Sequence, residues 1–260
     1  MRGHTDLVTG VAHLPDGRRI ITCSDDGSLR LWDLESGVQI DNDWRDDGKE
    51  GVWNISLSPN GKTVASGSSD GKVRLWDVET KKVVVRWTGH TSTVRSLCWS
   101  ADGGRVVSGS DDGTIRVWDV ESGNTVLGPI KTGHLYLSAV IYSPDTTKIA
   151  TGGLDETSLK IWDAKTGNLL STIKHDEQIW SMDLGSKEAY HRIRYHYDIR
   201  HRHMAANRHP GGSPIHCVLS LLVSERLPTW EWIVRCNSAS MESRYESPSR
   251  STHPASSLCL

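Results

Sequence analysis

A chain of 260 residues, 36% of them hydrophobic, is long enough to bury one large all-β core or two smaller ones. Its formal net charge of -2 excludes a uniformly basic nucleic-acid binder, and no run approaches the roughly 18 apolar residues of a membrane-spanning helix. The five cysteines are irregularly spaced and no apolar signal segment follows Met1, so we expect reduced thiols, a cytoplasmic or nuclear location and no membrane partner.

One pattern recurs four times along the first two thirds of the chain. Each copy ends in a Trp-Asp pair, and successive pairs are 42 to 44 residues apart. The pairs are Trp32-Asp33, Trp76-Asp77, Trp118-Asp119 and Trp162-Asp163. A fixed period of this length predicts a repeat architecture.

Each repeat contains short β-branched runs separated by turn residues. In the third repeat the runs are VRSLCWS, GRVVSGS, TIRVWDV and GNTVLGPI, and the turns carry Asp102-Gly103, Asp112-Gly113 and Ser122-Gly123. This pattern predicts four antiparallel strands joined by tight hairpins. A lone four-stranded sheet cannot cover both of its apolar faces, so successive sheets are expected to stack radially as a propeller.

Three repeats open with a Gly-His pair 28 residues before the Trp, at Gly3-His4, Gly89-His90 and Gly133-His134. With these motifs, residues 1 to about 185 resemble WD40 repeat proteins, in the style of fungal WD40 arrays. The resemblance implies an all-β propeller domain over residues 1–186. Its blades are expected at about 1–43, 44–86, 87–130 and 131–172, with a partial fifth at 173–186.

The array has fewer blades than propellers of this family usually have. We therefore expect an open, incomplete propeller. Its exposed sheet edges would be able to pair with another copy of the chain.

The resemblance also implies a hydrogen-bonded network of His, Ser or Thr, Asp and Trp within each blade. The matching residues are His4, Thr22, Asp26, Trp32, His90, Ser108, Asp112, Trp118, His134, Thr151, Asp155 and Trp162. The second repeat keeps Ser66, Asp70 and Trp76 but has Gly48 in place of the His. A buried Asp beside an indole and an imidazole must be hydrogen-bonded, or it costs several kcal/mol.

Two other chemistries would use some of the same residues. Ser108, His90 and Asp112 are the residue types of a hydrolytic triad, but the set recurs in three repeats, each time with an internal tryptophan. The pairs Asp25-Asp26 and Asp111-Asp112 lack the alternating spacing of calcium ligands. We therefore expect no enzyme activity, no metal and no cofactor.

The repeat pattern is lost near residue 186. Residues 187–260 carry 10 Lys and Arg against 6 Asp and Glu, and form an irregular basic tail. Short strands are predicted in Ile215–Val223 and Thr229–Cys236, whereas residues 237–260 are close to a disordered composition. Two interpretations of the tail stay open: a disordered segment, and a non-native reading of the gene.

The predicted function is a non-catalytic scaffold that presents the rigid face of a propeller to a protein or peptide. The resemblance places that face at the third and fifth residues after the His and at the residue before the network Asp. These positions are Leu7, Thr9, Asp25, Gly51, Trp53, Ser69, Thr93, Arg95, Asp111, Ser138, Leu154, Gln178 and Trp180.

Five of these residues are the candidate partner contacts: Trp53, Arg95, Asp111, Asp25 and Trp180. Aromatic side chains and arginine dominate interface energies, and Asp111 is expected to point outward. The alternative for the two tryptophans is purely local packing.

A second candidate function concerns the basic tail. The Arg- and Tyr-rich stretch 190–203 has the composition to contact RNA phosphates and bases, which would make the chain a component of an RNA-associated complex.

Overall fold

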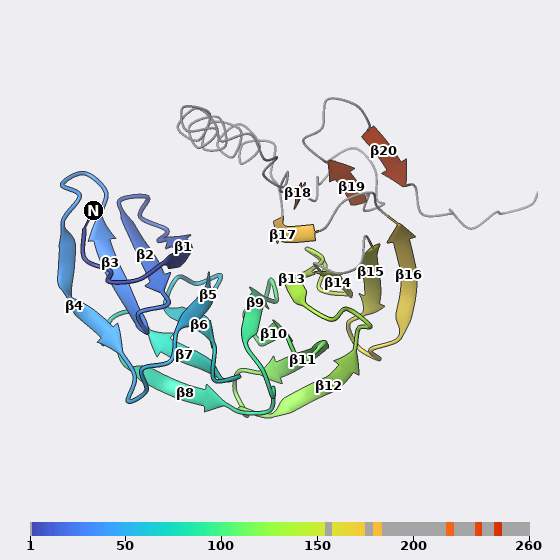
Figure 1. Ribbon diagram of the computed structural model, residues 1–260, viewed down its shortest axis with the longest axis horizontal. Helices are drawn as coiled ribbons and strands as arrows, with labels where there is room; N and C mark the ends of the chain where they lie inside the picture. The colour runs from blue at the N-terminus through green and yellow to red at the C-terminus, as the bar shows by residue number, and fades with distance from the viewer. Residues whose placement is uncertain are drawn as a thin grey trace, which may run out of the picture.

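The computed structural model describes residues 2–153, 158–174 and 179–183, together with three short strands at 217–220, 232–235 and 242–245. Every regular element in these ranges is a β-strand, so the expected all-β class is confirmed. Four sheets of four strands follow one another along the chain, as Figure 1 shows. Each is one blade, and each keeps its strands in sequence order.

The blades have closely similar strand lengths. Blade 1 contains β1 (Val8–His13), β2 (Arg19–Ser24), β3 (Ser28–Asp33) and β4 (Gln39–Arg45). Blade 2 contains β5 (Val52–Leu57), β6 (Thr63–Ser68), β7 (Val73–Asp77) and β8 (Val83–Trp87). Blade 3 contains β9 (Val94–Trp99), β10 (Arg105–Ser110), β11 (Thr114–Asp119) and β12 (Thr125–Lys131). Blade 4 contains β13 (Leu137–Tyr142), β14 (Lys148–Gly153), β15 (Ser158–Asp163) and β16 (Leu169–Lys174).

The hairpins of blade 3 use the predicted turn residues. All neighbouring strands in the sheet are antiparallel. Gly103, Gly113 and Gly123 have φ angles of 73°, 76° and 72°, a region that glycine enters without the steric cost other residues meet. The Gly113 N–H donates to the carbonyl of Ser110 at 3.0 Å and closes the turn between β10 and β11.

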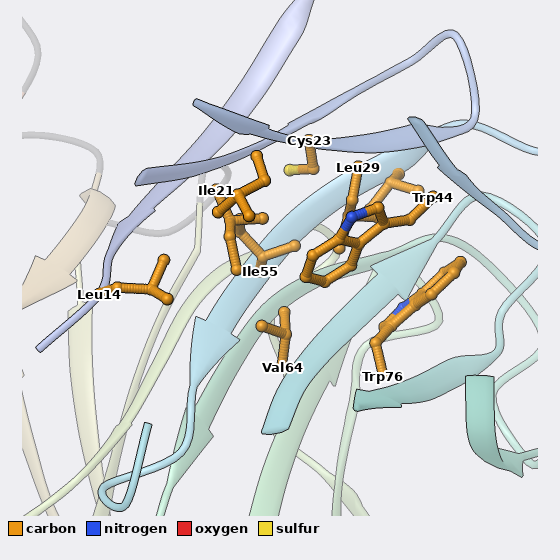
Figure 2. Close-up of a cluster of buried hydrophobic side chains, with 10 residues drawn as sticks. Leu14, Ile21, Cys23, Leu29, Trp44, Ile55, Val64 and Trp76 are labelled. Atoms are coloured by element: carbon orange, nitrogen blue, oxygen red, sulfur yellow. The ribbon is translucent and has the colours of Figure 1, made fainter. Parts of the chain in front are cut away.

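The apolar core lies between the blades. Figure 2 shows the cluster between blades 1 and 2, where Ile21, Leu29 and Trp44 of the first sheet meet Ile55 and Val64 of the second. Two further clusters join blade 2 to blade 3 and blade 3 to blade 4. Each sheet is therefore stabilised by its neighbours, as expected for stacked repeats.

The blades form an open arc. Figure 1 shows blade 1 at one end and blade 4 at the other, and the described sheets do not close into a ring. The prediction of four blades in an open array is confirmed.

A short strand follows blade 4. Strand β17 (Ile179–Asp183) packs against β13 and β14, and its Met182 is 8% exposed within the apolar cluster of blade 4. Strand β17 pairs in parallel with β18 (Cys217–Ser220), while β19 (Trp232–Arg235) pairs with β20 (Glu242–Tyr245). Strands β18 and β19 fall in the two predicted runs, β20 falls where composition favours disorder, and the predicted boundary at 186 lies outside the described residues.

Candidate protein-interaction site

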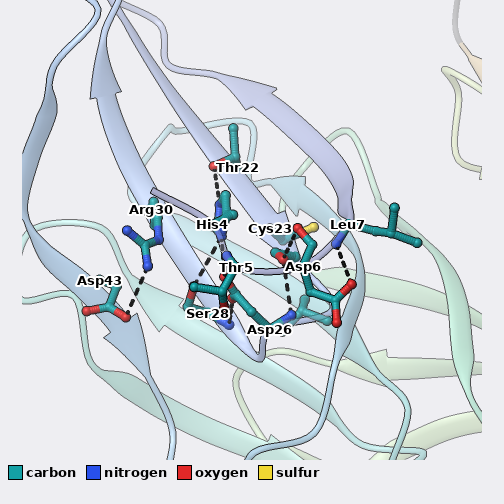
Figure 3. Close-up of polar contacts among 12 residues, drawn as sticks. His4, Thr5, Asp6, Leu7, Thr22, Cys23, Asp26, Ser28, Arg30 and Asp43 are labelled. Carbon is teal, nitrogen blue, oxygen red and sulfur yellow. Dashed lines mark hydrogen bonds and ion pairs between the residues drawn. The ribbon is translucent and has the colours of Figure 1, made fainter. Parts of the chain in front are cut away.

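The polar network of blade 1 joins the N-terminal segment to β2, to β3 and to the turn between them. His4 Nδ1 lies 2.9 Å from Asp26 Oδ2, and His4 Nε2 lies 2.8 Å from Thr22 Oγ1 (Figure 3). Trp32 Nε1 donates to the same Thr22 hydroxyl at 2.8 Å. Ser28 Oγ also donates to Asp26, at 2.5 Å. The network therefore fixes the segment that leads into β1.

Blade 3 repeats the arrangement around His90. Its Nδ1 lies 2.9 Å from Asp112 Oδ2 and its Nε2 lies 2.8 Å from Ser108 Oγ, which accepts from Trp118 Nε1 at 2.8 Å. An ionised carboxylate only accepts, so Nδ1 carries the proton and the Ser108 hydroxyl donates to Nε2. Each donor in this series of hydrogen bonds, which runs from Trp118 to Asp112, then has one acceptor.

The charges of this pair follow from its surroundings. Burial lowers the pKa of His90, although the Asp112 carboxylate opposes that shift. Burial alone would raise the pKa of Asp112, but hydrogen bonds from Thr114, Thr91 and His90 hold that pKa below its usual range. Both shifts favour a neutral imidazole beside an ionised carboxylate.

Blade 4 has the same tryptophan and hydroxyl contact. Trp162 Nε1 donates to Thr151 Oγ1 at 2.9 Å, and Thr151 Oγ1 lies 3.3 Å from His134 Nε2. Asp155, the expected carboxylate of this network, lies outside the described residues.

Blade 2 replaces the missing imidazole with a guanidinium. Trp76 Nε1 still donates to Ser66 Oγ at 2.8 Å, but Asp70 receives Arg74 Nη2 at 2.7 Å. Arg74 Nε donates to Asp46 Oδ2 at 2.6 Å, and the Arg74 side chain is 6% exposed. Burial would raise the pKa of Asp70, but Arg74 and the backbone of Lys72 hold it below its usual range. The sequence predicts that the network histidine is missing at Gly48, but it does not predict that Arg74 takes the place of that histidine.

The triad-like set of blade 3 faces inward. Its distances resemble those of a nucleophile, base and orienting carboxylate. However, Ser108 is 0% exposed and its oxygen already accepts the indole N–H of Trp118. These three side chains therefore offer no nucleophile to a substrate.

Three of the predicted partner contacts meet at the junction of blades 2 and 3. The guanidinium carbon of Arg95, on β9, lies 4.2 Å from the ring centroid of Trp53, on β5. Arg95 Nε donates to Asp111 Oδ2 at 2.8 Å. We name Trp53, Arg95 and Asp111 the arginine stack.

The expected outward position of Asp111 is wrong. Its side chain is 11% exposed, it is paired with Arg95, and its Oδ1 is buried without a hydrogen-bond partner among the described residues. Arg95 lies on β9, the strand beside the turn that carries Asp111, so its guanidinium covers the Asp111 carboxylate. The Arg95 side chain is 32% exposed, so it is more accessible to solvent than Asp111.

The equivalent positions in the other blades differ. In blade 1, Thr9 replaces the arginine and donates to the carbonyl of Val52 at 2.5 Å, and no ion pair involves Asp25 in the described part of the chain. Trp180 lies in β17, but its side chain falls outside the described set, as do Leu154 and Gln178.

Two exposed residues on blade 4 were missed. Leu135 and Tyr136 are 70% and 54% exposed just before β13. Leu137 of blade 4 pairs with Gly153, and Val94 of blade 3 pairs with Ser110 at the same place in its sheet. The residues just before them therefore correspond, so Tyr136 takes the place of Thr93. Counting from His134 hides this correspondence because the segment from His134 to Leu137 is one residue shorter than the segment from His90 to Val94. Aligning the apolar residue that begins the strand would have found it.

Metal binding, a membrane span and RNA binding concern other parts of the chemistry considered above. Within that part of the chain no group of three His, Cys, Asp or Glu side chains is placed to hold a metal ion. No helix there has the length and apolar character to cross a membrane. The Arg-rich stretch 190–203, on which RNA binding depends, lies outside the described residues.

Comparison with known proteins adds a family and one relative. The sequence matches the family model described as "WD domain, G-beta repeat" over residues 1–33, 45–77, 81–119 and 127–163, more than half of the chain. Periodic tryptophan protein 2 of Saccharomyces cerevisiae is 44% identical over 36 residues, which are 14% of this chain and 4% of that protein. The chain therefore spans a small fraction of that relative's length, and the aligned stretch is shorter than one repeat.

Proposed function

Because the chain belongs to the WD40 repeat family, we propose that it is a protein-interaction scaffold whose arginine stack contacts a protein or peptide partner. WD40 repeat proteins are generally non-catalytic scaffolds. The repeat networks support this function by holding rigid the segments that carry Trp53 and Arg95.

The observation that carries the proposal is the geometry of Arg95. Trp53 supports one face of the guanidinium, and Asp111 binds its Nε. The terminal nitrogens of Arg95 have no hydrogen-bond or ion-pair partner among the described residues, so they are available to a ligand. A side chain held in place loses less conformational entropy on binding than a free arginine does.

The chemistry of Arg95 selects its ligand. A planar guanidinium binds a carboxylate through two parallel hydrogen bonds. The partner we propose therefore places an Asp, a Glu or a C-terminal carboxylate over blades 2 and 3. An apolar group beside that carboxylate would contact the Trp53 ring.

Selection from a random peptide library on the immobilised protein tests the proposal. We expect enriched peptides to contain a carboxylate, and Arg95→Ala to weaken their binding by about 2 kcal/mol, roughly thirtyfold. Arg105→Ala is the matched control, because Arg105 is exposed at the start of β10 and makes no ion pair in the described part of the chain. Equal binding by wild type and Arg95→Ala would reject the arginine stack as the site.

A further inference from the structure

One apolar sheet face at the end of the arc is uncovered. In blade 1, Val8 and Val11 of β1 are 57% and 55% exposed, His13 of the same strand is exposed, and the adjacent Leu7 is 69% exposed. We name Leu7, Val8, Val11 and His13 the open face.

The positions of Val8 and Val11 are buried in the other blades. Strand pairing makes the comparison residue by residue, because Val11 pairs with the network Thr22 as Leu97 pairs with Ser108. The counterparts of Val8 are Val52, Val94 and Leu137, which are 3%, 0% and 0% exposed, and those of Val11 are Ile55, Leu97 and Val140, which are 8%, 6% and 0% exposed.

What covers these positions is the sheet of the preceding blade. Strand β9 packs on β5 and β6, and Val94 lies so close to Gly67 of β6 that an added Cβ there would be 2.7 Å from Val94 Cγ1. Trp99 Nε1 donates to the carbonyl of Ser56 at 2.9 Å across the same junction. Three junctions in one chain thus show that this face packs against another β-sheet.

The opposite end of the array is already covered. The face of blade 4 that points away from blade 3 packs against β17, and Met182 is buried there. A second copy therefore cannot use that face without displacing β17. Among the described residues, the open face is the uncovered sheet face that two copies can share.

Strand β1 also lacks the usual protection against association. Its sequence, VTGVAH, contains no Lys, Arg, Asp or Glu. Burying an unpaired charged side chain in a contact between sheets is costly, so the absence of such residues from β1 removes that cost from a contact with a like surface.

We propose that the open faces of two copies of this chain pack against each other in a two-fold symmetric dimer. A two-fold contact uses the same patch on both subunits, which fits the one uncovered sheet face in the described part of the chain. This contact is between the faces of two sheets, unlike the pairing of open edges that the sequence predicts. It does not depend on the arginine stack.

Sedimentation equilibrium of the 260-residue chain over a range of concentrations tests the dimer. We expect the wild type to approach twice the monomer mass, and Val11→Asp to weaken association at least tenfold. Val84→Asp is the matched control, because Val84 of β8 is 58% exposed but lies away from the open face. Circular dichroism would verify that both variants are folded. A wild type that stays monomeric, or equal weakening by both substitutions, would overturn the proposal.

A crosslinking measurement identifies the symmetry. Near a two-fold axis, Val11→Cys places like positions of the two copies close together, so oxidation should join position 11 of one copy to position 11 of the other. Val84→Cys should not crosslink in this way. Growth into assemblies larger than a dimer, without the link between like positions, would show a head-to-tail contact and contradict the symmetric dimer.

Discussion

Blades 2 and 3 have the same strands and the same buried tryptophan contact, but different partners for the network carboxylate. Trp76 and Trp118 each donate to a serine at 2.8 Å. Asp112 of blade 3 binds the imidazole of His90, whereas Asp70 of blade 2 binds the guanidinium of Arg74. The blade therefore requires a donor for this carboxylate more than it requires a histidine.

The replacement uses a residue that every blade has available. The position paired with the network hydroxyl carries a cation in each repeat: Arg30, Arg74, Arg116 and Lys160. Where the histidine is present, this cation binds elsewhere, as Arg30 Nη1 does by donating to Gln39 Oε1 at 2.7 Å. In blade 2 no imidazole occupies the space, and the guanidinium reaches the carboxylate.

Among these substitutions, removing Arg74 should cause the largest loss in the free energy of unfolding. Arg74→Ala leaves Asp46 and Asp70, which are 10% and 14% exposed, without their shared cation. Breaking a buried ion pair from one side typically costs 3–5 kcal/mol, and we expect a loss at the lower end, about 3 kcal/mol. Both carboxylates keep some solvent contact, Asp46 keeps Arg86 and Asp70 keeps Lys72. Urea unfolding followed by tryptophan fluorescence measures the loss.

The conservative substitution sharpens this prediction. Arg74→Lys keeps the charge but cannot place two nitrogens on two carboxylates in the same way, so its loss should be intermediate. A loss below about 1 kcal/mol for Arg74→Ala would mean that the cation is not needed in blade 2.

Removing the histidine of blade 3 should cost less. His90→Ala removes the hydrogen bonds of the imidazole to Asp112 and Ser108, but Asp112 keeps the N–H and hydroxyl of Thr114 and the N–H of Thr91. Ser108 keeps its contact with Trp118. We expect a loss of about 2 kcal/mol in the same urea experiment, since buried groups lose partners but no buried charge loses its counter-ion. A loss larger than that of Arg74→Ala would mean that His90 contributes more to the free energy of unfolding than Arg74 does, contrary to this prediction.

The sequence predicts the features that depend on local pattern. Hairpins follow from turn pairs such as Asp112-Gly113, and the fixed spacing from His90 to Trp118 marks the repeat. The bridge from Arg74 to Asp46 is different, because 28 residues separate the two and the sheet fold brings them together. The pairing of Arg95 with Asp111 likewise depends on which strand lies beside the turn, and spacing alone leaves that carboxylate free to point outward.

The two blades should also differ in their response to acid. The lowered pKa of His90 means that the unfolded chain binds that proton more readily. This contribution to stability is full above the unfolded pKa of 6.5 and is lost as the pH falls below it. The pKa of the Asp70 carboxyl is also lowered, but from an unfolded value of 3.8. The stability that Asp70 contributes is therefore lost only as the pH falls below 3.8.

Urea midpoints at about pH 7 and pH 5 measure this difference. The wild type should lose stability over that interval, and His90→Gln should reduce the loss because glutamine does not titrate. Arg74→Gln is the matched control in blade 2 and should leave the pH dependence of the midpoint unchanged. An equal loss in wild type and His90→Gln would place the titrating group outside blade 3.

The smallest effect is expected for the second arginine of blade 2. Arg86 also binds Asp46, and it makes the largest contribution to the lowered pKa of that carboxyl, with burial opposing and Arg74 adding to the shift. Its side chain is nevertheless 47% exposed. In Arg86→Ala, water can take its place while Arg74 still neutralises Asp46, so we expect a loss below about 1 kcal/mol that shrinks as salt is added. A salt-independent loss as large as that of Arg74→Ala would show instead that Asp46 depends on Arg86, and that the buried guanidinium serves Asp70 alone.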